Sequence, residues 1–296
     1  MVKSSVSQTR VWFITGCSSG LGRALARTVL ERGEIVVLTA LEPQLLEDLV
    51  AEYQSYTLTL RLDVTKPKEV KAAVSKAIAK FGRIDVLVNN AGWEVDGAIE
   101  EVSDEAFRRV FDTNLFGVLE ILRTVVPQMR QQRSGHILNI SSIACFEANP
   151  GMGFYTSSKL ALEGISVCLA REVAPFGLKV TIVEPGAFRT DFMKNCFVLA
   201  DTQIEDYKPY VELKKQWLTR YRIDNTSSPG DPNKAALAII KAVDSDNPPI
   251  RLALGSDAVK TVEESLKSIK AELDTWREVS ISTDFDEVVA DRTKVI

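Results

Sequence analysis

The stretch Thr15-Gly16-Cys17-Ser18-Ser19-Gly20-Leu21-Gly22 follows a short apolar run that begins at Val11. The next segment, residues 23–32, alternates small and apolar side chains as an amphipathic helix does. In a turn between a strand and a helix, glycines let the backbone approach a pyrophosphate, and the helix N-terminus supplies unpaired N–H groups. The stretch therefore predicts a phosphate-binding turn at the start of an α/β fold.

Strand-length apolar runs and helix-period segments alternate along the rest of the chain. The runs cover residues 34–40, 57–64, 84–90, 136–142, 178–184 and 250–255, and the helical segments include 67–81, with Thr65 as its cap, 107–130 and 155–174. Because the runs are continuously apolar, both faces of each strand should be buried, which is typical of a parallel sheet. We predict a Rossmann-type, doubly wound sheet of seven parallel strands with helices on both faces.

No linker rich in Pro or Ser divides the 296 residues, so we expect a single domain. Its cofactor half should cover about residues 9–150, and its catalytic and substrate half about 151–281. Residues 187–231 carry no strand-like run but are rich in aromatic side chains, namely Phe188, Phe192, Phe197, Tyr207, Tyr210, Trp217 and Tyr221. This insertion is either a lid over an apolar ligand or a pair of amphipathic helices packed on the body. The tail, 282–296, has no clear period and is either loose or lies across a partner.

Composition excludes several classes of function. The net charge is −4 and no stretch collects a stripe of Lys and Arg, so we expect no nucleic-acid partner. Charges, Gly or Pro interrupt every apolar run before the ~20 residues of a membrane span, and the N-terminus lacks the apolar core of a signal peptide. The four cysteines show no CxxC spacing, which favours reduced thiols and a cytoplasmic protein. The single histidine, His136, opens a strand and is interpreted as structural, and one histidine rules out a multi-histidine metal site.

Polar residues follow two further strands at the points where they end. Asp63 comes at the end of the third strand, and Asn89-Asn90-Ala91-Gly92 at the end of the fourth. Because the carboxyl ends of parallel strands share one edge, these residues should converge with the glycine turn at a ligand-binding crevice.

A second constellation is Tyr155-x-x-x-Lys159 at the start of a predicted helix, preceded by Ser142 at the end of a strand. Residues four apart share a helix face, so the Lys159 ammonium can stand near the Tyr155 phenol. A neighbouring cation lowers the pKa of a tyrosine from its usual ~10, which would make the phenol a better acid–base group near neutrality. Ser142 would hydrogen-bond a substrate oxygen as negative charge develops on it.

Taken together, these motifs resemble the short-chain dehydrogenase/reductase family. Residues 15–22 match its TGxxxGxG loop and 89–92 its NNAG, while Asn114, Ser142, Tyr155 and Lys159 match its four catalytic positions, and Pro185-Gly186 with Thr190 its nicotinamide-side segment. The resemblance covers residues 9–195 in the correct order. The C-terminal part is similar to the 17β-hydroxysteroid-dehydrogenase-like branch.

The resemblance implies an NAD(P)(H)-dependent oxidoreductase that interconverts a carbonyl and a secondary alcohol. Tyr155 would exchange the proton with the substrate oxygen, Lys159 would lower the Tyr155 pKa and bind the nicotinamide ribose, and Asn114 would hold a water. The cofactor would further contact Gly16, Ser18, Ser19, Gly20, Leu21, Gly22, Ala40, Leu41, Asp63, Val64, Asn90, Ala91, Gly92, Pro185, Gly186 and Thr190. Relatives use helices like those at 107–130 and 155–174 to dimerise, so we expect a homodimer or homotetramer.

Cofactor choice is where the chain departs from the family pattern. NAD-preferring relatives carry a carboxylate at the end of the second strand, and NADP-preferring ones carry an arginine just after it. Here those positions read Ala40 and Leu41. Ser18 and Ser19 could donate to a 2′-phosphate, whereas Glu42 could serve the ribose instead. We expect a weak preference for NADP(H).

The substrate is expected to be a bulky hydrophobic ketone or alcohol. Aromatic and apolar side chains that would line its cleft are Trp93, Phe146, Met152, Phe154, Phe188 and Phe192, although several of these rings could belong to the core. The alternatives are a nucleotide-binding scaffold or sensor without turnover and a redox-neutral enzyme of the same descent, such as an epimerase, dehydratase or cyclase. The four catalytic residues argue against the scaffold.

Overall fold

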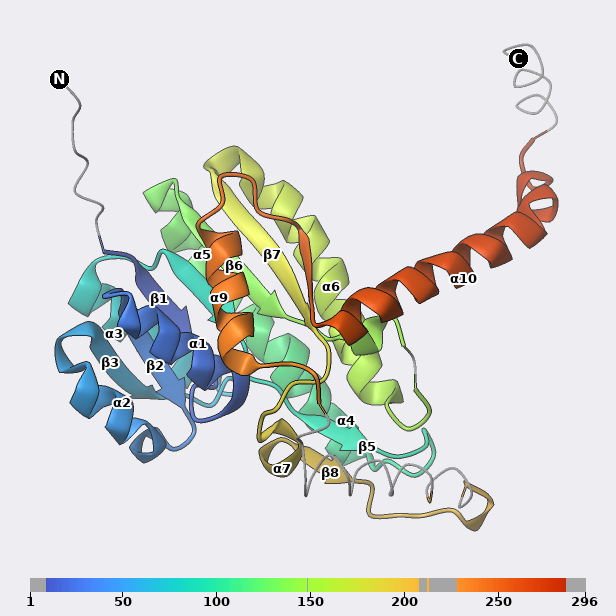
Figure 1. Ribbon diagram of the computed structural model, residues 1–296, viewed down its shortest axis with the longest axis horizontal. Helices are drawn as coiled ribbons and strands as arrows, with labels where there is room; N and C mark the ends of the chain where they lie inside the picture. The colour runs from blue at the N-terminus through green and yellow to red at the C-terminus, as the bar shows by residue number, and fades with distance from the viewer. Residues whose placement is uncertain (1–8, 148, 208–211, 213–227, 286–296) are drawn as a thin grey trace.

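Seven strands form one sheet in the order β3-β2-β1-β4-β6-β7-β9 (Figure 1). The computed structural model describes residues 9–147, 149–207, 212 and 228–285. The strands are β1 (Val11–Ile14), β2 (Ile35–Ala40), β3 (Thr57–Arg61), β4 (Val86–Asn89), β6 (Gly135–Ile140), β7 (Leu178–Pro185) and β9 (Arg251–Leu254), all paired in parallel. The predicted sheet is confirmed. Its order reverses between β1 and β4, which is where such sheets open a ligand crevice.

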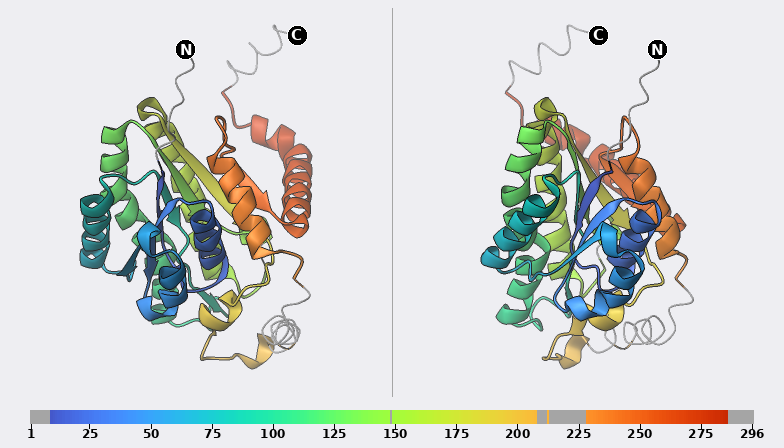
Figure 2. Two further views of the ribbon diagram at one scale, coloured as in Figure 1. Left: turned by 60° about the vertical axis from the view of Figure 1, so that its left-hand side comes forward. Right: turned by 90° about the vertical axis from the view of Figure 1, so that its left-hand side faces the viewer.

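Helices cover both faces of this sheet (Figure 2). One face carries α1 (Gly20–Glu31), α2 (Glu47–Glu52) and α9 (Pro232–Val243), and the other carries α3 (Pro67–Phe81), α5 (Gly117–Gln132) and α6 (Gly153–Val173). Successive residues of β1 divide between the two cores, since Trp12 and Ile14 join the first and Val11 and Phe13 the second. Burial on both faces explains why the strands read as continuous apolar runs.

Two helix predictions need correction. Residues 107–130 do not form one helix: α4 (Asp104–Phe111) is followed by a π-helical segment, Asp112–Phe116, and then by α5. The N-cap position of helix α3 is Lys66, which makes no side-chain capping hydrogen bond, rather than Thr65, whose hydroxyl donates to Asp63 Oδ1 at 2.7 Å. An apolar period cannot reveal a π turn, because that turn keeps the apolar face while adding one residue.

The expectation that residues 187–231 lack a strand is also wrong. After the short helix α7 (Phe192–Asn195), β8 (Phe197–Leu199) pairs in parallel with β5 (Glu94–Asp96). Three residues are too few to show a period, and tertiary contact with β5 decides the conformation. Tyr210, Trp217 and Tyr221 of this insertion lie outside the described residues.

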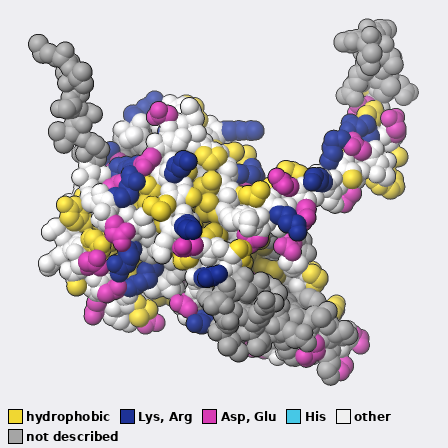
Figure 3. Space-filling model, viewed as in Figure 1, with side chains coloured by type: hydrophobic (Ala, Val, Ile, Leu, Met, Phe, Trp, Pro, Cys, Tyr) yellow, Lys and Arg dark blue, Asp and Glu magenta, His cyan; other side chains and the backbone are white. Residues whose placement is uncertain are grey.

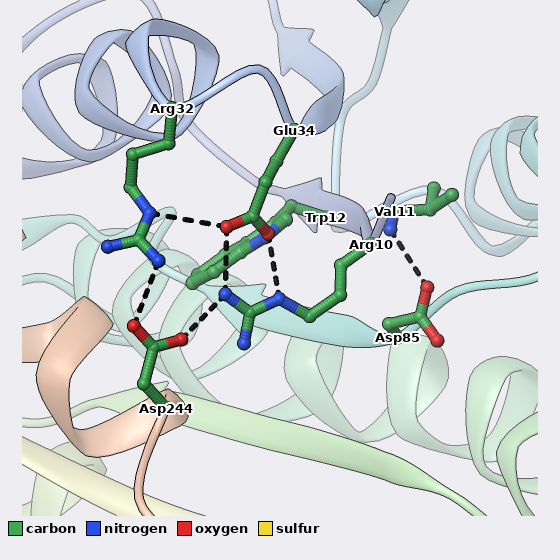
Figure 4. A network of polar contacts seen from close by, with 7 residues as sticks. All are labelled: Arg10, Val11, Trp12, Arg32, Glu34, Asp85 and Asp244. Atoms are coloured by element: carbon green, nitrogen blue, oxygen red, sulfur yellow. Dashed lines mark hydrogen bonds and ion pairs between the residues drawn. The ribbon is translucent and has the colours of Figure 1, made fainter. Parts of the chain in front are cut away.

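An ion-pair network closes the edge of the sheet where the strands begin (Figure 4). Arg10 donates to both carboxylate oxygens of Glu34 at 2.8 and 2.7 Å, and Trp12 Nε1 donates to the same carboxylate at 2.7 Å. Arg10 and Arg32 both reach Asp244, just after α9. These contacts tie β1, α1 and α9 together and leave the opposite edge for ligands.

The last helix, α10 (Ser256–Ile281), begins at the carboxyl edge beside β9 and then leaves the body of the molecule (Figure 1). Among the described helices, none has both the length and the apolar character needed to cross a membrane. The four cysteines, Cys17, Cys145, Cys168 and Cys196, are free thiols.

Candidate active site at the carboxyl edge of the sheet

The glycine turn after β1 is built on positions that demand glycine. Gly16 and Gly20 have φ values of +71° and +61°, in the left-handed region that disfavours other residues. At Gly22 a Cβ atom would overlap the Asn90 side-chain amide and the Gly16 carbonyl oxygen. These glycines let the turn be compact, and without side chains they leave its backbone free to face a ligand.

The end of β4 braces this turn. Asn90 Nδ2 donates to the carbonyl oxygens of Thr15 and Gly16 at 2.9 and 3.0 Å. The backbone N–H groups of Asn90 and Ala91 both donate to the Thr15 hydroxyl, at 2.9 and 3.0 Å. The Asn90 side chain, expected to contact the cofactor, thus holds the shape of the phosphate-binding turn.

The N-terminus of α1 fits a pyrophosphate. Its N-cap residue, Ser19, is extended and makes no side-chain capping hydrogen bond, and the first turn carries no acidic residue. The first N–H groups of the helix and its positive dipole end are thus left to an anionic ligand. This open cap and the crowded Gly22 are the structural observations that fit a dinucleotide cofactor.

The adenosine side combines expected residues with one that the sequence analysis missed. Ala40 is buried and Leu41 is 58% exposed. Asp63 Oδ1 accepts from the backbone N–H and the hydroxyl of Thr65, so this carboxylate shapes its own turn, and Val64 is buried beneath it. Arg23 is the missed residue: its guanidinium donates to the Leu45 carbonyl at 2.8 Å and lies 3.5 Å from the Ser18 carbonyl. It directly follows Gly22, and a cation beside a phosphate-binding turn is the signal that could have drawn attention to it.

The four catalytic candidates lie around Gly92. A Cβ atom at Gly92 would lie 3.6 Å from both Asn114 Oδ1 and Lys159 Nζ. Lys159 Nζ donates to the Ile140 carbonyl at 2.8 Å and lies 5.7 Å from the centroid of the Tyr155 ring. Ser142, at the end of β6, hydrogen-bonds the Tyr155 side chain. Four elements, β4, β6, the π-helical segment and α6, thus bring these groups to one place.

Asn114 is completely buried in the π-helical segment and is fixed by three hydrogen bonds. Its Oδ1 accepts from the Trp93 N–H at 2.8 Å, and its Nδ2 donates to the Trp93 carbonyl at 2.9 Å and to Ser158 Oγ at 3.0 Å. π-helical turns often occur at functional sites. Here the turn directs an asparagine between β4 and α6.

Burial governs the ionisation of the Tyr155–Lys159 pair. It raises the pKa of the Tyr155 phenol far above its usual value; the Glu94 carboxylate adds to this rise, and the hydrogen bond with Ser142 opposes it. Burial also lowers the pKa of Lys159 to about 8. This differs from the prediction that Lys159 lowers the phenol pKa, because desolvation of the buried phenol is the largest influence on its pKa. Glu94, a buried acid two residues after Gly92, was also missed.

The segment after β7 faces the glycine turn. Thr190 packs beside Gly20, where a Cβ atom would lie 3.6 Å from the threonine Cβ, and Asn195 Nδ2 donates to Ser19 Oγ at 3.4 Å. The segment is anchored by Asp257 at the start of α10, which accepts from the Ala187 N–H at 2.7 Å. Its carboxylate also fills the space that a Gly186 side chain would need. Asp257 follows the last strand at the ligand edge, which is the positional signal that the sequence analysis did not use.

The six substrate candidates occupy different surroundings. Phe192 lies beside Tyr155, with ring centroids 6.4 Å apart, whereas Phe188 packs against Gly230 and the core under α9. Trp93 is 9% exposed under the Arg109 guanidinium, 4.2 Å from its ring centroid, and Phe154 stacks on Phe107. Phe146 and Met152 are half-buried in the segment between β6 and α6. The geometry thus favours Phe192 as the ring that meets a substrate at the phenol.

Comparison with known proteins agrees with this geometry. Residues 10–198 match the family model described as short chain dehydrogenase. The chain is 37% identical over 276 residues to "Oxidoreductase BOA17" of Botryotinia fuckeliana (strain B05.10), which covers 93% of this chain and 99% of that protein. It is 39% identical over 249 residues to a "3-ketodihydrosphingosine reductase" of Bacteroides thetaiotaomicron, covering 84% and 88%.

Solved structures show the same fold. A short-chain dehydrogenase from Streptomyces avermitilis superposes with a TM-score of 0.86 at 42% identity, over 94% of this chain and 99% of that one. A 3-ketoacyl-(acyl-carrier-protein) reductase from Brucella melitensis was solved with NADH, with a TM-score of 0.69 at 25% identity, over 82% and 96%. An alcohol dehydrogenase from Thermococcus sibiricus was solved with 5-hydroxy-NADP, with a TM-score of 0.68 at 25% identity, over 83% and 96%.

Proposed function

Because this chain belongs to the short-chain dehydrogenase family, we propose that it is an NAD(P)(H)-dependent oxidoreductase that interconverts a ketone and a secondary alcohol, with Tyr155 as the proton donor and acceptor. The observation that carries the proposal is the joint placement of Tyr155, Lys159, Ser142 and Asn114 beside an open glycine turn. The bound nicotinamide would supply the hydride.

In the reducing direction, Tyr155 would give its proton to the substrate oxygen. The phenol is protonated at neutral pH, so a proton is available as negative charge develops on that oxygen. Ser142 already hydrogen-bonds the phenol, and its hydroxyl would share the same oxygen and stabilise the developing charge.

Lys159 would bind the nicotinamide ribose and Asn114 would position a water. An ammonium carries three donors, and within the described chain one of those of Lys159 is used on the Ile140 carbonyl. The other two can serve the ribose hydroxyls. Asn114 Oδ1 lies toward Gly92 with Lys159, and a carbonyl oxygen accepts two hydrogen bonds, of which Trp93 provides one.

We propose NADP(H) as the preferred cofactor. Ala40 offers no carboxylate to repel a 2′-phosphate, and Arg23 brings a cation to the carbonyl of Ser18. Arg23 is also bound by Asp48, with 2.6 Å to each carboxylate oxygen, so a phosphate would have to compete with this exposed pair. Glu42 contacts Gln44 at 3.1 Å, which leaves it occupied locally.

The substrate is proposed to be a bulky hydrophobic ketone. Phe192 provides an apolar wall beside Tyr155, and the relative from Bacteroides thetaiotaomicron is named as the reductase of a keto compound. A place in the 17β-hydroxysteroid-dehydrogenase-like branch stays a prediction. Four free thiols support a reducing, cytoplasmic setting.

The test is Tyr155→Phe, with turnover followed by NADPH fluorescence against hydrophobic ketones of increasing ring number. We expect a loss in kcat of at least ~100-fold, because positioned acid–base catalysis contributes about 10²–10⁴-fold. The Kd for NADPH should change by no more than a few-fold. Tyr56→Phe is the matched control, because Tyr56 is 42% exposed and lies far from Tyr155 in the sequence. This variant should keep full activity. Near wild-type turnover of Tyr155→Phe would overturn the assigned role.

A further inference from the structure

The C-terminal helix α10 carries a heptad repeat. Its apolar residues follow one another at alternating steps of three and four: Val259, Val262, Leu266, Ile269, Leu273 and Trp276. In the heptad notation abcdefg these are three successive pairs of a and d positions. A 3.5-residue period sustained over three heptads predicts a helix whose apolar seam meets another helix of the same kind.

The seam is exposed in the single chain. Within the part of the chain that the structure describes, Ala258 is the buried residue of α10, and the seam side chains other than Val262 are 49–62% exposed. The base of the helix contacts β9 and the short turn Ile143–Cys145, and the rest stands off the body as an arm that carries side chains of both charges (Figure 3). A contiguous apolar stripe of this kind on a soluble protein marks an interaction surface.

The charges that flank the seam are complementary to the same helix in parallel orientation. Glu272 occupies a g position and Arg277 the following e position, so each Glu272 would face Arg277 of the partner subunit. In antiparallel orientation, Lys270 would face its own copy instead. Arg277 contacts Asp274 at 2.7 Å in the single chain, an exposed pair that costs little to exchange.

The same charges disfavour a lipid surface. α10 contains four basic and six acidic residues, a net charge of −2. Amphipathic helices that bind anionic membranes are rich in Lys and Arg on the polar face. An acidic polar face would be repelled by such a membrane.

We propose that α10 forms a parallel coiled coil with the α10 helix of another copy of this chain. The interface is isologous: each helix contributes the same a and d side chains and the same Glu272–Arg277 flank. It buries an apolar stripe that the body leaves exposed, and it starts two residues after Asp257, which anchors the segment following β7.

The first test compares the masses of two variants that change the charge equally. Leu266→Glu/Leu273→Glu places two carboxylates in the seam, and Lys267→Glu/Asp274→Glu places them one residue further on, facing away from it. Both lower the net charge by two. By sedimentation equilibrium of the full chain, we expect the first variant to lose at least half of the wild-type mass and the second to keep it. The mass ratio also gives the number of helices in the seam, which we expect to be two.

The second test does not depend on a destabilised helix. Leu273→Cys should form a disulfide between copies under mild oxidation, because residues at the heptad a position face each other in register in a parallel pair. Asp274→Cys and the wild-type chain should not form this disulfide. In an antiparallel pair, positions 273 would lie about 16 Å apart, given a rise of ~1.5 Å per residue, and would not join.

Several results would overturn the proposal. These are an unchanged mass for Leu266→Glu/Leu273→Glu, equal cross-linking of Leu273→Cys and Asp274→Cys, and a wild-type chain of single-chain mass that sediments with phosphatidylserine vesicles. A mass loss without cross-linking of Leu273→Cys would show that the seam either pairs in antiparallel orientation or docks on the body of the other copy, and either result excludes the parallel helix pair.

Discussion

The side chain at position 40 sets the charge that a 2′-phosphate would meet. Ala40 ends β2 next to the glycine turn and offers neither repulsion nor a hydrogen bond to a ribose. The nearby cation, Arg23, comes from α1 and was not evident from the pattern at the end of the strand. We therefore expect cofactor choice in this chain to depend also on Arg23, which is not one of the usual two positions.

Replacing Ala40 tests the preference for NADP(H). We expect wild-type protein to bind NADPH more tightly than NADH, and Ala40→Asp to weaken NADPH binding by ~10-fold or more, because a carboxylate would face the 2′-phosphate; ten-fold corresponds to ~1.4 kcal/mol. Fluorescence titration of both cofactors measures this. Ala40→Asn introduces a side chain of the same size as aspartate but without its charge, and it should leave most of the preference intact. Equal affinities of the wild-type protein for the two cofactors would refute the proposal.

At the scale of elements, the neighbouring strands β6 and β7 hold two groups whose titrations oppose each other. His136 in β6 is buried and shares a 2.9 Å hydrogen bond with Thr181 of β7; burial lowers its pKa to about 4. Glu184 in β7 is buried near Glu163, and burial raises its pKa to about 7 despite the ion pair with Arg251. His136 thus acts as the structural residue that its place in the sequence indicates.

The two groups give opposite dependences of stability on pH. The stabilising contribution of neutral His136 is lost as pH falls from about 6.5 to about 4, because the unfolded chain then binds the proton more readily. The contribution of protonated Glu184 is lost as pH rises from about 4.5 to about 7, because the folded chain must then ionise a buried carboxyl. Between about pH 4.5 and 6.5 the two dependences partly cancel.

Glu184→Gln should separate these effects. We expect the free energy of unfolding to rise by ~1–3 kcal/mol relative to wild type at pH 8 and to change little at pH 5, because the variant never ionises. Urea unfolding at pH 5, 6.5 and 8 measures it. Glu31→Gln, at an exposed site on α1, should be neutral throughout. If Glu184→Gln destabilised the protein at pH 8, the ion pair with Arg251 would outweigh burial.

For the whole molecule, we predict a second association surface on the faces of α5 and α6. A groove of about 390 Å³ lies between them, lined by Leu119, Leu122, Arg123, Val126, Gly164, Ile165, Cys168, Leu169 and Glu172. Its lining is mostly apolar, and that these helices form a homo-oligomer stays a prediction. Together with the α10 seam, two separate faces would then build the assembly.

Cys168→Glu tests this groove without disturbing the core, because Cys168 is exposed in the single chain. A charge buried between two copies is costly unless it is paired, so we expect light scattering to show a mass reduced by at least half. Cys168→Ser, which keeps size and neutrality, should retain the wild-type mass. An unchanged mass for Cys168→Glu would place the contact elsewhere.

Local sequence rules are enough to predict the sheet, the glycine turn and the shared helix face of Tyr155 and Lys159. Continuous apolar runs identify buried parallel strands, and the glycine cluster identifies a turn in which Gly16 and Gly20 take the left-handed conformation. Tyr155 and Lys159 share one helix face because they are four residues apart. Each of these is a local rule that neighbouring residues satisfy. Such rules need no knowledge of what packs against the segment.

Tertiary structure alone decided the features that join distant segments. Asn90 braces the turn after β1, Asp257 anchors the segment after β7, and β8 is a strand because it meets β5. The high pKa of Tyr155 follows from enclosure by several elements, which overrides the cation four residues away. The physical reason is common to all: hydrogen-bond partners and desolvation come from whatever lies nearby in space, and sequence spacing specifies neighbours only within a few residues.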